Sequence, residues 1–446
     1  MNAAETRETS VRAIFDLAWP IMISMLSYTA MSVIDTLFVS RLGTDPLAAV
    51  GLAAVLVFFT QSFGAGLMSG TRVLVSQCTG ANDLKTASLL GWQAIWIGVP
   101  LGIAMSLLSL APPDLFYLFG ANETVAEYSD SFFSIRILGA PLVLLNIGIS
   151  AYFQGRGDTK TPMRATLLGN GINIAMDPLL IFGLWGWPEL GVAGAALATI
   201  TAMLFQVCYL FWKVLPELSK VDHASNSRLI KATFDMGVPI GVRYMLEMGS
   251  FVVFTAMVTH VSPIELAAHI IVVRICSISF MPGHAVSEAA GVLVGQFIGS
   301  NRPHLARPVI HSAIKLAVGI MASWGVIFLT IPDLLVLPFD TEPAVATVAS
   351  QVLIIAAIFQ VFDALVMAIS GGLNGAGDTR WVMVSSLLAA WLIKVPLAYL
   401  GTLVLGFGAA GAWCAFTVEL FVLSFVFLHR MRGHAWLRGA ALAPAG

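Results

Sequence analysis

Acidic and amide side chains interrupt two long apolar stretches of this sequence. Asp35 lies in one stretch, and the other contains Asn173 and Asp177, four residues apart, with Pro178 directly after the acid. Residues at this spacing share one face of a helix, and a proline leaves a nearby backbone carbonyl without its usual amide partner. Carboxylates, an amide and a carbonyl are suitable ligands for a proton or a small hard cation. We predict that Asp35, Asn173 and Asp177 form one cation site, which could bind a sodium ion. The alternative is that they are hydrogen-bonded packing groups at helix ends.

Two further acids, Glu247 and Asp363, are isolated on apolar stretches in the second half of the chain. A charged side chain at the centre of a membrane helix costs about 2.5–3.5 kcal/mol, so each one needs a reason. Arg243, Arg274 and His269 are candidate neighbours for them. We predict that Glu247 and Asp363 bind a cation or a substrate.

The composition excludes a soluble protein. Of the 446 residues, 58% are hydrophobic and 11% are charged, which is too little charge to cover a globule of this size. The formal net charge of -2 provides no basic surface, so nucleic-acid binding is excluded as well. The acids described above must therefore be positioned by membrane-spanning helices.

Apolar segments of about twenty residues, the length that crosses a bilayer, recur twelve times along the chain. With the N-terminus placed in the cytoplasm, sixteen Lys and Arg residues lie in cytoplasmic segments and Arg41 alone lies on the opposite side. This positive-inside bias predicts that both termini are cytoplasmic. The predicted spans are residues 13–39, 47–75, 88–110, 128–153, 163–183, 190–213, 237–260, 266–297, 308–331, 345–372, 382–404 and 408–429.

The second half of the sequence repeats the first at a nearly constant offset of 217 to 220 residues. Six spans per half is an even number, so both halves enter the membrane from the same side. We therefore predict an all-α integral membrane protein with twelve transmembrane helices, in two parallel six-helix repeats related by a pseudo-two-fold axis along the membrane normal. The matching segments are 19–21 with 238–240, 47–49 with 266–268, 77–82 with 296–301, 155–159 with 375–379, and 191–195 with 408–412.

The duplication also predicts how the chain is divided. Residues 1–213 form an N-terminal six-helix lobe, residues 236–446 form a C-terminal one, and residues 214–235 form a polar cytoplasmic linker. Two similar lobes leave a cleft between them, and rocking of the lobes would open that cleft to either side of the membrane in turn.

A proline is a candidate hinge in the first span. Pro20 lies inside that span, and its counterpart Pro239 begins the seventh. An interior proline removes a helical hydrogen bond and can bend the helix, so Pro20 would move Asp35 relative to its partners. A static kink is the alternative.

The membrane acids are not duplicated along with the scaffold. Asp35 corresponds to Phe254, and Asp177 corresponds to Val395. Lys394 adjoins that second position, where it could serve as an internal counter-ion or extend towards the membrane surface. The charges were therefore added to each half separately.

Several chemistries have no motif in this sequence. There is no GxxxxGK[ST] loop for nucleotide, no HExxH pattern for zinc and no GxSxG elbow for hydrolysis. We expect that the protein is not an enzyme, needs no cofactor and draws on a gradient of protons or sodium ions.

Six motifs, spread over essentially the whole chain, complete the pattern: Trp19-Pro20, Val33-Ile-Asp35-Thr, Gln154-Gly-Arg-Gly-Asp-Thr-Lys160, Asn173-Ile-Ala-Met-Asp177-Pro, Leu190-Gly-Val-Ala-Gly-Ala-Ala-Leu-Ala-Thr199 and Asn374-Gly-Ala-Gly-Asp-Thr379. Together they resemble the multidrug and toxic compound extrusion (MATE) family. The resemblance implies two six-helix lobes and the export of varied, often cationic drugs in exchange for protons or sodium ions.

The resemblance also implies roles for particular residues. Similarity to the DinF-like branch implies that Asp35, Asn173 and Asp177 couple to the ion, together with Thr199 as the matching threonine of the sixth helix. Similarity to the NorM-like branch implies that the second-lobe acids, Glu247 and Asp363, also take part. The sequence carries both sets, with Phe359 where the family pattern has a tyrosine one turn before Asp363.

We therefore expect a secondary-active multidrug efflux antiporter in the inner membrane of a bacterium. Its partners would be small-molecule drugs or organic cations and the lipid bilayer, and we expect a monomer. An exporter or flippase of one endogenous or lipid-linked metabolite is the main alternative, since the same scaffold could support it. A membrane enzyme or receptor is disfavoured, because no nucleophile and base are arranged together.

Overall fold

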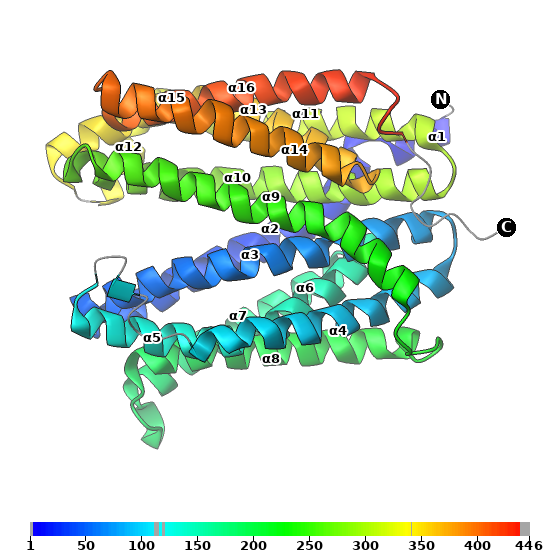
Figure 1. Ribbon diagram of the computed structural model, residues 1–446, viewed down its shortest axis with the longest axis horizontal. Coiled ribbons are helices and arrows are strands. Elements are labelled where there is room, and N and C mark those ends of the chain that lie inside the picture. The colour runs from blue at the N-terminus through cyan, green and yellow to red at the C-terminus, as the bar shows by residue number, and fades with distance from the viewer. Residues whose placement is uncertain (1–2, 111–115, 118–120, 340, 438–446) are drawn as a thin grey trace. The chain divides into compact units, whose positions relative to one another are not determined.

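The computed structural model describes residues 3–110, 116–117, 121–339 and 341–437, and this part of the chain is helical with no β-strand. The final residues of the predicted C-terminal lobe, 438–446, lie outside the described residues. The main helices are labelled in Figure 1. They are α1 (Ala3–Glu8), α2 (Val11–Ser40), α3 (Thr44–Gly80), α4 (Leu84–Ser106), α5 (Glu123–Leu138), α6 (Ala140–Gly155), α7 (Lys160–Phe182), α8 (Gly191–Leu218), α9 (Ser227–Thr259), α10 (Pro263–Gly299), α11 (Ala306–Thr330), α12 (Pro332–Val336), α13 (Pro343–Gly375), α14 (Thr379–Ala389), α15 (Val395–Tyr399) and α16 (Gly408–Arg432).

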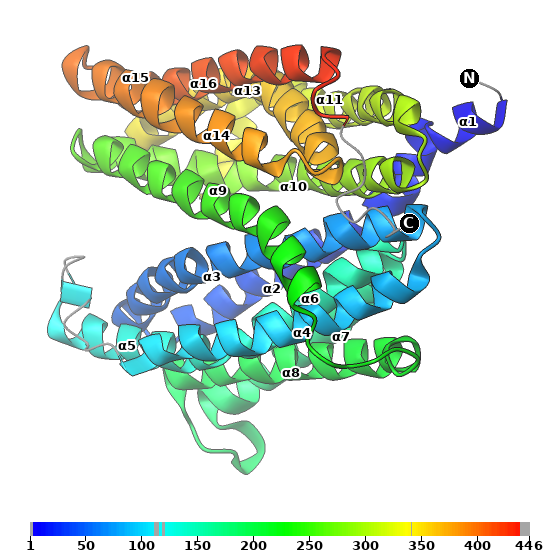
Figure 2. The same cartoon turned by 45° about the vertical axis from the view of Figure 1, so that its right-hand side comes forward.

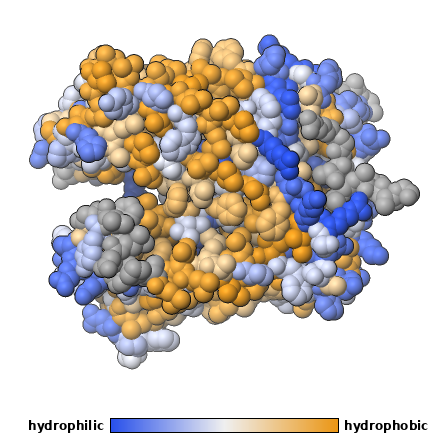
Figure 3. Space-filling model, in the orientation of Figure 1, coloured by the Kyte–Doolittle hydropathy of each residue, from blue (hydrophilic) through white to orange (hydrophobic). Residues whose placement is uncertain are grey.

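The prediction of twelve membrane-spanning segments is confirmed. Among the described residues, eleven helices are long and apolar enough to cross a bilayer, and the pair α5 and α6 forms a twelfth when counted as one bent span. Large apolar side chains such as Leu37 and Trp212 are 60% and 66% exposed, which suits a surface that faces lipid. On the face shown in Figure 3, hydrophobic residues cover the middles of the helices and hydrophilic residues gather towards their ends.

The fourth span is bent by 45° between α5 and α6. Gly139 separates the two helices, and Pro141 stands at the start of α6. Proline has no amide hydrogen to donate to the preceding turn, which favours a bend at this point. Gly102 of α4 packs directly against Pro141, because a Cβ added there would come within 2.4 Å of the proline Cα.

The chain divides into two compact units. We call residues 23–79 and 83–241 the N-unit, and residues 1–22, 80–82 and 242–446 the C-unit. The boundary between the units crosses two long helices, after Met22 in α2 and after Gly241 in α9. In each helix it falls two residues after a proline. The lobes predicted over 1–213 and 236–446 stay a prediction.

The beginning of α9 is packed into the N-unit. A Cβ added to Gly237 would lie 2.1 Å from the backbone oxygen of Leu67, and one added to Gly66 would lie 2.5 Å from the Cα of Gly241. Only glycine allows two helix backbones to approach so closely. The prediction that Pro239 begins its helix is wrong: α9 starts at Ser227, so Pro239 lies inside it. The side chain of Asn226 caps that start by accepting from the amide of Arg228 at 3.0 Å.

The segment between α8 and α9 is held to α4 by hydrogen bonds. The indole of Trp92 donates to the carbonyl of Leu218 at 3.0 Å, and the indole of Trp96 donates to that of His223 at 2.8 Å. Gln93 accepts from the backbone amide of Asn226 at 2.9 Å. Residues 219–226, the non-helical part of the predicted linker, therefore form a fixed part of the N-unit.

The C-unit is built around α10, α13 and α16, which pack side by side (Figure 1 and Figure 2). Its core includes a group of aromatic rings from three of its helices, Phe254, Phe359, Trp413 and Phe416, with ring centroids between 4.7 and 6.5 Å apart. The N-terminal segment belongs to this unit as well, since Glu8 forms an ion pair with Arg302 at 2.9 Å.

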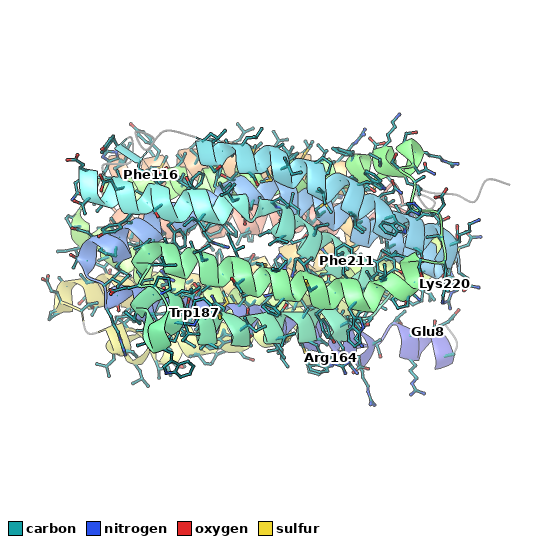
Figure 4. The ribbon with its side chains drawn as sticks, turned by 90° about the horizontal axis from the view of Figure 1, so that it is seen from below. Glu8, Phe116, Arg164, Trp187, Phe211 and Lys220 are labelled. Carbon is teal, nitrogen blue, oxygen red and sulfur yellow. The ribbon has the colours of Figure 1, made fainter. Side chains whose placement is uncertain are left out.

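Figure 4 shows that the two ends of the N-unit differ in character. Arg164, near the start of α7, and Lys220, just after α8, lie at one end, while Phe116 and Trp187 lie at the other. Trp187 is 49% exposed, as expected for an aromatic ring at a membrane interface. Which of these ends faces the cytoplasm stays a prediction.

Candidate functional site

The parallel helices α2 and α7 of the N-unit are held together in a constant register. The amide of Asn170 donates to the hydroxyl of Ser27 at 2.8 Å. Nearer the other end, the rings of Phe38 and Phe182 meet edge to face with centroids 6.2 Å apart. Both contacts join residues separated by 143 or 144 positions in the chain. Residues of α2 and α7 that lie between the two contacts, at a spacing within about one residue of these values, should therefore lie near one another.

Asp35 and Asp177 lie between these two contacts and are 142 positions apart (177 minus 35), within one residue of that spacing, and the structure places their carboxyl groups close enough to interact. Asp177 is fully buried and Asp35 is half-buried. Neither oxygen of Asp177 receives a hydrogen bond from any donor group in the described residues. Two carboxyl groups can bond to one another only when one of them carries the proton. A pair of carboxyl groups in this arrangement can share a proton, or bind a cation in its place.

Asn173 lies one turn before Asp177 on the same face of α7. It is fully buried, and among the described residues neither its amide nitrogen nor its amide oxygen has a hydrogen-bond partner. A buried amide without partners is costly, which favours a ligand such as a water molecule or an ion at this place. The predicted partner Thr199 is also buried, and its hydroxyl donates to the carbonyl of Ala195 one turn earlier in α8 at 3.0 Å. Its part in the cation site stays a prediction.

Arg136 is a component of this site that the sequence did not identify. It belongs to α5, is 8% exposed, and lies close enough to Asp35 for the two charges to interact. One guanidinium beside two carboxyl groups leaves a single negative charge, which one proton or one monovalent cation would neutralise. The only sequence signal was the position of a lone arginine inside an apolar span.

A sodium ion would find suitable donors here. The two carboxyl groups and the oxygen of Asn173 are the hard ligands that such an ion prefers. The part of the chain that the structure describes contains no group of three or more His, Cys, Asp or Glu side chains able to hold a metal ion. A cation at this place would therefore rely on amide and carbonyl oxygens besides Asp35 and Asp177.

The predicted second-lobe residues, Glu247 and Asp363, both lie in the C-unit, and they differ in their charged neighbours. Glu247 pairs with Arg243, one turn earlier in α9, at 3.8 Å. Asp363 of α13 is 7% exposed, and its Oδ2 has no hydrogen-bond partner among the described residues. The charges of both Glu247 and Glu419 act on Asp363, so these three acids form one electrostatic cluster. We call them the C-unit acid cluster.

Glu419 of α16 pairs with Lys394 at 3.4 Å, and the two side chains are 6% and 5% exposed. The ammonium of Lys394 also lies 4.9 Å from the ring centroid of Phe416. The sequence left open whether this lysine is an internal counter-ion, and the structure places it against an acid.

The remaining candidate neighbours do not bind the C-unit acids. His269 is buried, and its Nδ1 accepts a hydrogen bond from the indole of Trp413 at 3.2 Å while its Nε2 faces the hydroxyl of Thr255 at 3.1 Å. Arg274 is exposed. The ring of Phe359 packs against Phe416 at 4.7 Å, so it fills space where a tyrosine would offer a hydroxyl.

Pro20 lies inside α2, which continues as one helix from Val11 to Ser40. Its missing hydrogen bond does not break the helix in this conformation. The role of Pro20 as a hinge stays a prediction.

Comparison with known proteins places the chain in a family. The MatE family model matches residues 20–179 and again residues 239–400, so each predicted repeat is matched once. "Probable multidrug resistance protein NorM" of Pseudomonas putida is 29% identical over 468 residues, with all of both chains covered. The protein of the same description from Burkholderia pseudomallei is 32% identical over 409 residues, covering 89% of this chain and 87% of that one.

The fold has counterparts among solved structures. A structure described as the outward-facing conformation of a multidrug resistance MATE family transporter of the MOP superfamily is similar with a TM-score of 0.89. It is 22% identical in sequence, and the likeness covers 98% of this chain and 99% of that one. With both repeats matched by one family model and the whole length shared with these relatives, the chain belongs to the MatE family of membrane transporters.

Proposed function

We propose that this protein is a secondary-active antiporter that exports lipophilic, often cationic compounds in exchange for protons or sodium ions. The observation that carries the proposal is the buried pair of Asp35 and Asp177 on adjoining helices of the N-unit. The descriptions of the bacterial relatives as multidrug resistance proteins support the choice of substrate class.

The pair can couple ion binding to a change of conformation. With Arg136 nearby, the site carries one excess negative charge when empty and is neutral when one proton or sodium ion is bound. Burial of an uncompensated charge is costly, so the empty and occupied sites favour different conformations. A gradient that loads the site from outside and empties it inside would then drive the export half of the cycle.

We further propose that the protein is a monomer in the bacterial inner membrane, with both termini in the cytoplasm. The strong bias of Lys and Arg towards one set of connections supports this orientation. Substrate would be held mainly by apolar contacts, since the proposed compounds are lipophilic and 58% of the residues are hydrophobic.

The test is ion-driven export by purified protein in proteoliposomes, with Asp35→Asn and Asp177→Asn each compared with the native chain. Each amide keeps the size of the carboxyl group but cannot exchange a proton or supply a negative ligand. Both variants should lose gradient-driven export of a lipophilic dye while remaining folded. Asp45→Asn, at an exposed position at the start of α3, is the matched control and should transport normally. Undiminished coupled transport in both site variants would overturn the proposal.

Export or flipping of one endogenous or lipid-linked metabolite is the alternative function. The same expression strain distinguishes the two. Resistance to several unrelated dyes and antibiotics supports multidrug export, whereas protection limited to one compound favours the alternative.

A further inference from the structure

We infer that Lys394 is a tethered cation that occupies the C-unit acid cluster in place of an inorganic ion, so that ion exchange is confined to the Asp35 and Asp177 pair. The inference rests on the proposed function, because it states where the exchanged ion does not bind. Lys394 would thereby be a residue that decides ion specificity.

The surroundings of the ammonium group resemble those of a bound cation. Lys394 is 4% exposed, and its nitrogen lies 3.4 Å from a carboxylate oxygen of Glu419 and 4.9 Å from the ring centroid of Phe416. A carboxylate and an aromatic face are the two groups that proteins commonly use to hold a positive charge away from water. The side chain is too deeply buried to be explained as one that reaches to the membrane surface.

The balance of charge in the C-unit acid cluster shows why the ammonium of Lys394 would replace an inorganic cation. Glu247 is compensated by Arg243 at 3.8 Å, and Glu419 is compensated by Lys394 at 3.4 Å. Asp363 alone has no ion pair among the described residues, and the nearby charge of Glu419 acts on it. Without Lys394, two buried carboxyl groups of the cluster would lack a counter-charge. Oxygen ligands in that situation favour a small hard cation such as sodium.

The local backbone positions the lysine. Lys394 is the last residue of a π-helical turn, η6 (Ala390–Lys394), and a second π-helical turn, η7 (Leu400–Val404), follows α15. Each such turn contains an extra residue and so rotates the side chains that follow around the helix. The corresponding helix of the N-unit, α7, is a regular α-helix around Pro178 and carries Asp177, which corresponds to Val395, the residue after Lys394. The two units thus present opposite charges from equivalent helices.

The inference predicts that removal of the ammonium creates a sodium site. Binding of radioactive sodium to purified protein would be measured for Lys394→Met, for the double variant Lys394→Met with Glu419→Gln, and for Lys394→Arg. Lys394→Met should gain a saturable sodium site that is absent from the native C-unit. The double variant should lose this site, and Lys394→Arg should not gain it. Lys315→Met, at an exposed position of α11, is the matched lysine control and should bind sodium like the native protein.

A second measurement leaves Lys394 in place, in case the buried substitution prevents folding. In the Asp35→Asn and Asp177→Asn double variant, the C-unit is intact and should bind no sodium. Saturable sodium binding there would overturn the inference, as would a folded Lys394→Met variant that gains no site. Neither result depends on transport, so failure of the inference is distinguishable from failure of the proposed antiport.

Discussion

Single substitution in the buried ion pair between Lys394 and Glu419 should lower stability strongly, whereas double substitution should change it little. The two charged atoms are 3.4 Å apart, and both side chains are almost fully buried. With an effective dielectric constant of about 20, their attraction is about 5 kcal/mol. Removing two charges from water costs several kcal/mol each, so the pair as a whole contributes little net stability.

Loss of one partner should destabilise the protein, because it leaves the other charge buried without a counter-charge. Glu419→Gln and Lys394→Met should each lower the free energy of unfolding by about 3–5 kcal/mol. The double variant, which leaves no charge, should lie within about 1 kcal/mol of the native protein. The coupling free energy of the double-mutant cycle should therefore be at least about 5 kcal/mol in magnitude.

The assay is denaturant-induced unfolding of purified protein in detergent, followed by tryptophan fluorescence in sodium-free buffer at alkaline pH. Addition of sodium should restore part of the stability of Lys394→Met, because a ligand that binds only the folded state stabilises it by mass action. In the native protein, sodium should not bind to the C-unit and so should not raise stability through it. Single variants that lose less than about 1 kcal/mol each, with additive effects in the double variant, would refute the reasoning.

Two further predictions concern the N-unit. Arg136→Gln removes the positive charge that acts on Asp35, so the carboxyl pair should hold its cation about tenfold more tightly, equivalent to about 1.4 kcal/mol. Ion-binding titration of purified protein checks this, and an unchanged affinity would show that the guanidinium does not act on the site. Gly237→Ala should destabilise the protein by about 1–3 kcal/mol, because its Cβ would lie 2.1 Å from the backbone oxygen of Leu67. Thermal unfolding measures the effect, with Gly171→Ala as the control, since a Cβ at Gly171 meets no atom within 4 Å; equal effects of the two substitutions would contradict the packing argument.

Much of the fold follows from the sequence because a bilayer permits few structures. Apolar length, the bias of basic residues and the internal repeat together predicted the twelve spans and the family fold. The convergence of Asp35 and Asp177 followed from their equivalent depth in two spans that run in the same direction. The beginning of α9 was missed, although Asn226 before Ser227 is a recognisable helix cap.

Contacts that depend on helix rotation could not be predicted in the same way. Arg136 lies in a bent span, and which face of α5 turns towards Asp35 depends on how that bend packs. Lys394 is positioned by a π-helical turn, which no propensity or period in the sequence indicates. The partner of that lysine, Glu419, lies on a different helix, so the pair is visible only in three dimensions.

Helices α2 and α9 each contribute residues to both units. The start of α2 belongs with the second half of the chain, while the start of α9 belongs with the first half. The duplicated halves have thus exchanged their leading segments, in the manner of a domain swap within one polypeptide. A gene cut between α8 and α9 would yield two fragments, each lacking a piece of its own fold. Neither fragment should be stable when made alone, and assembly should require that both are made in the same cell.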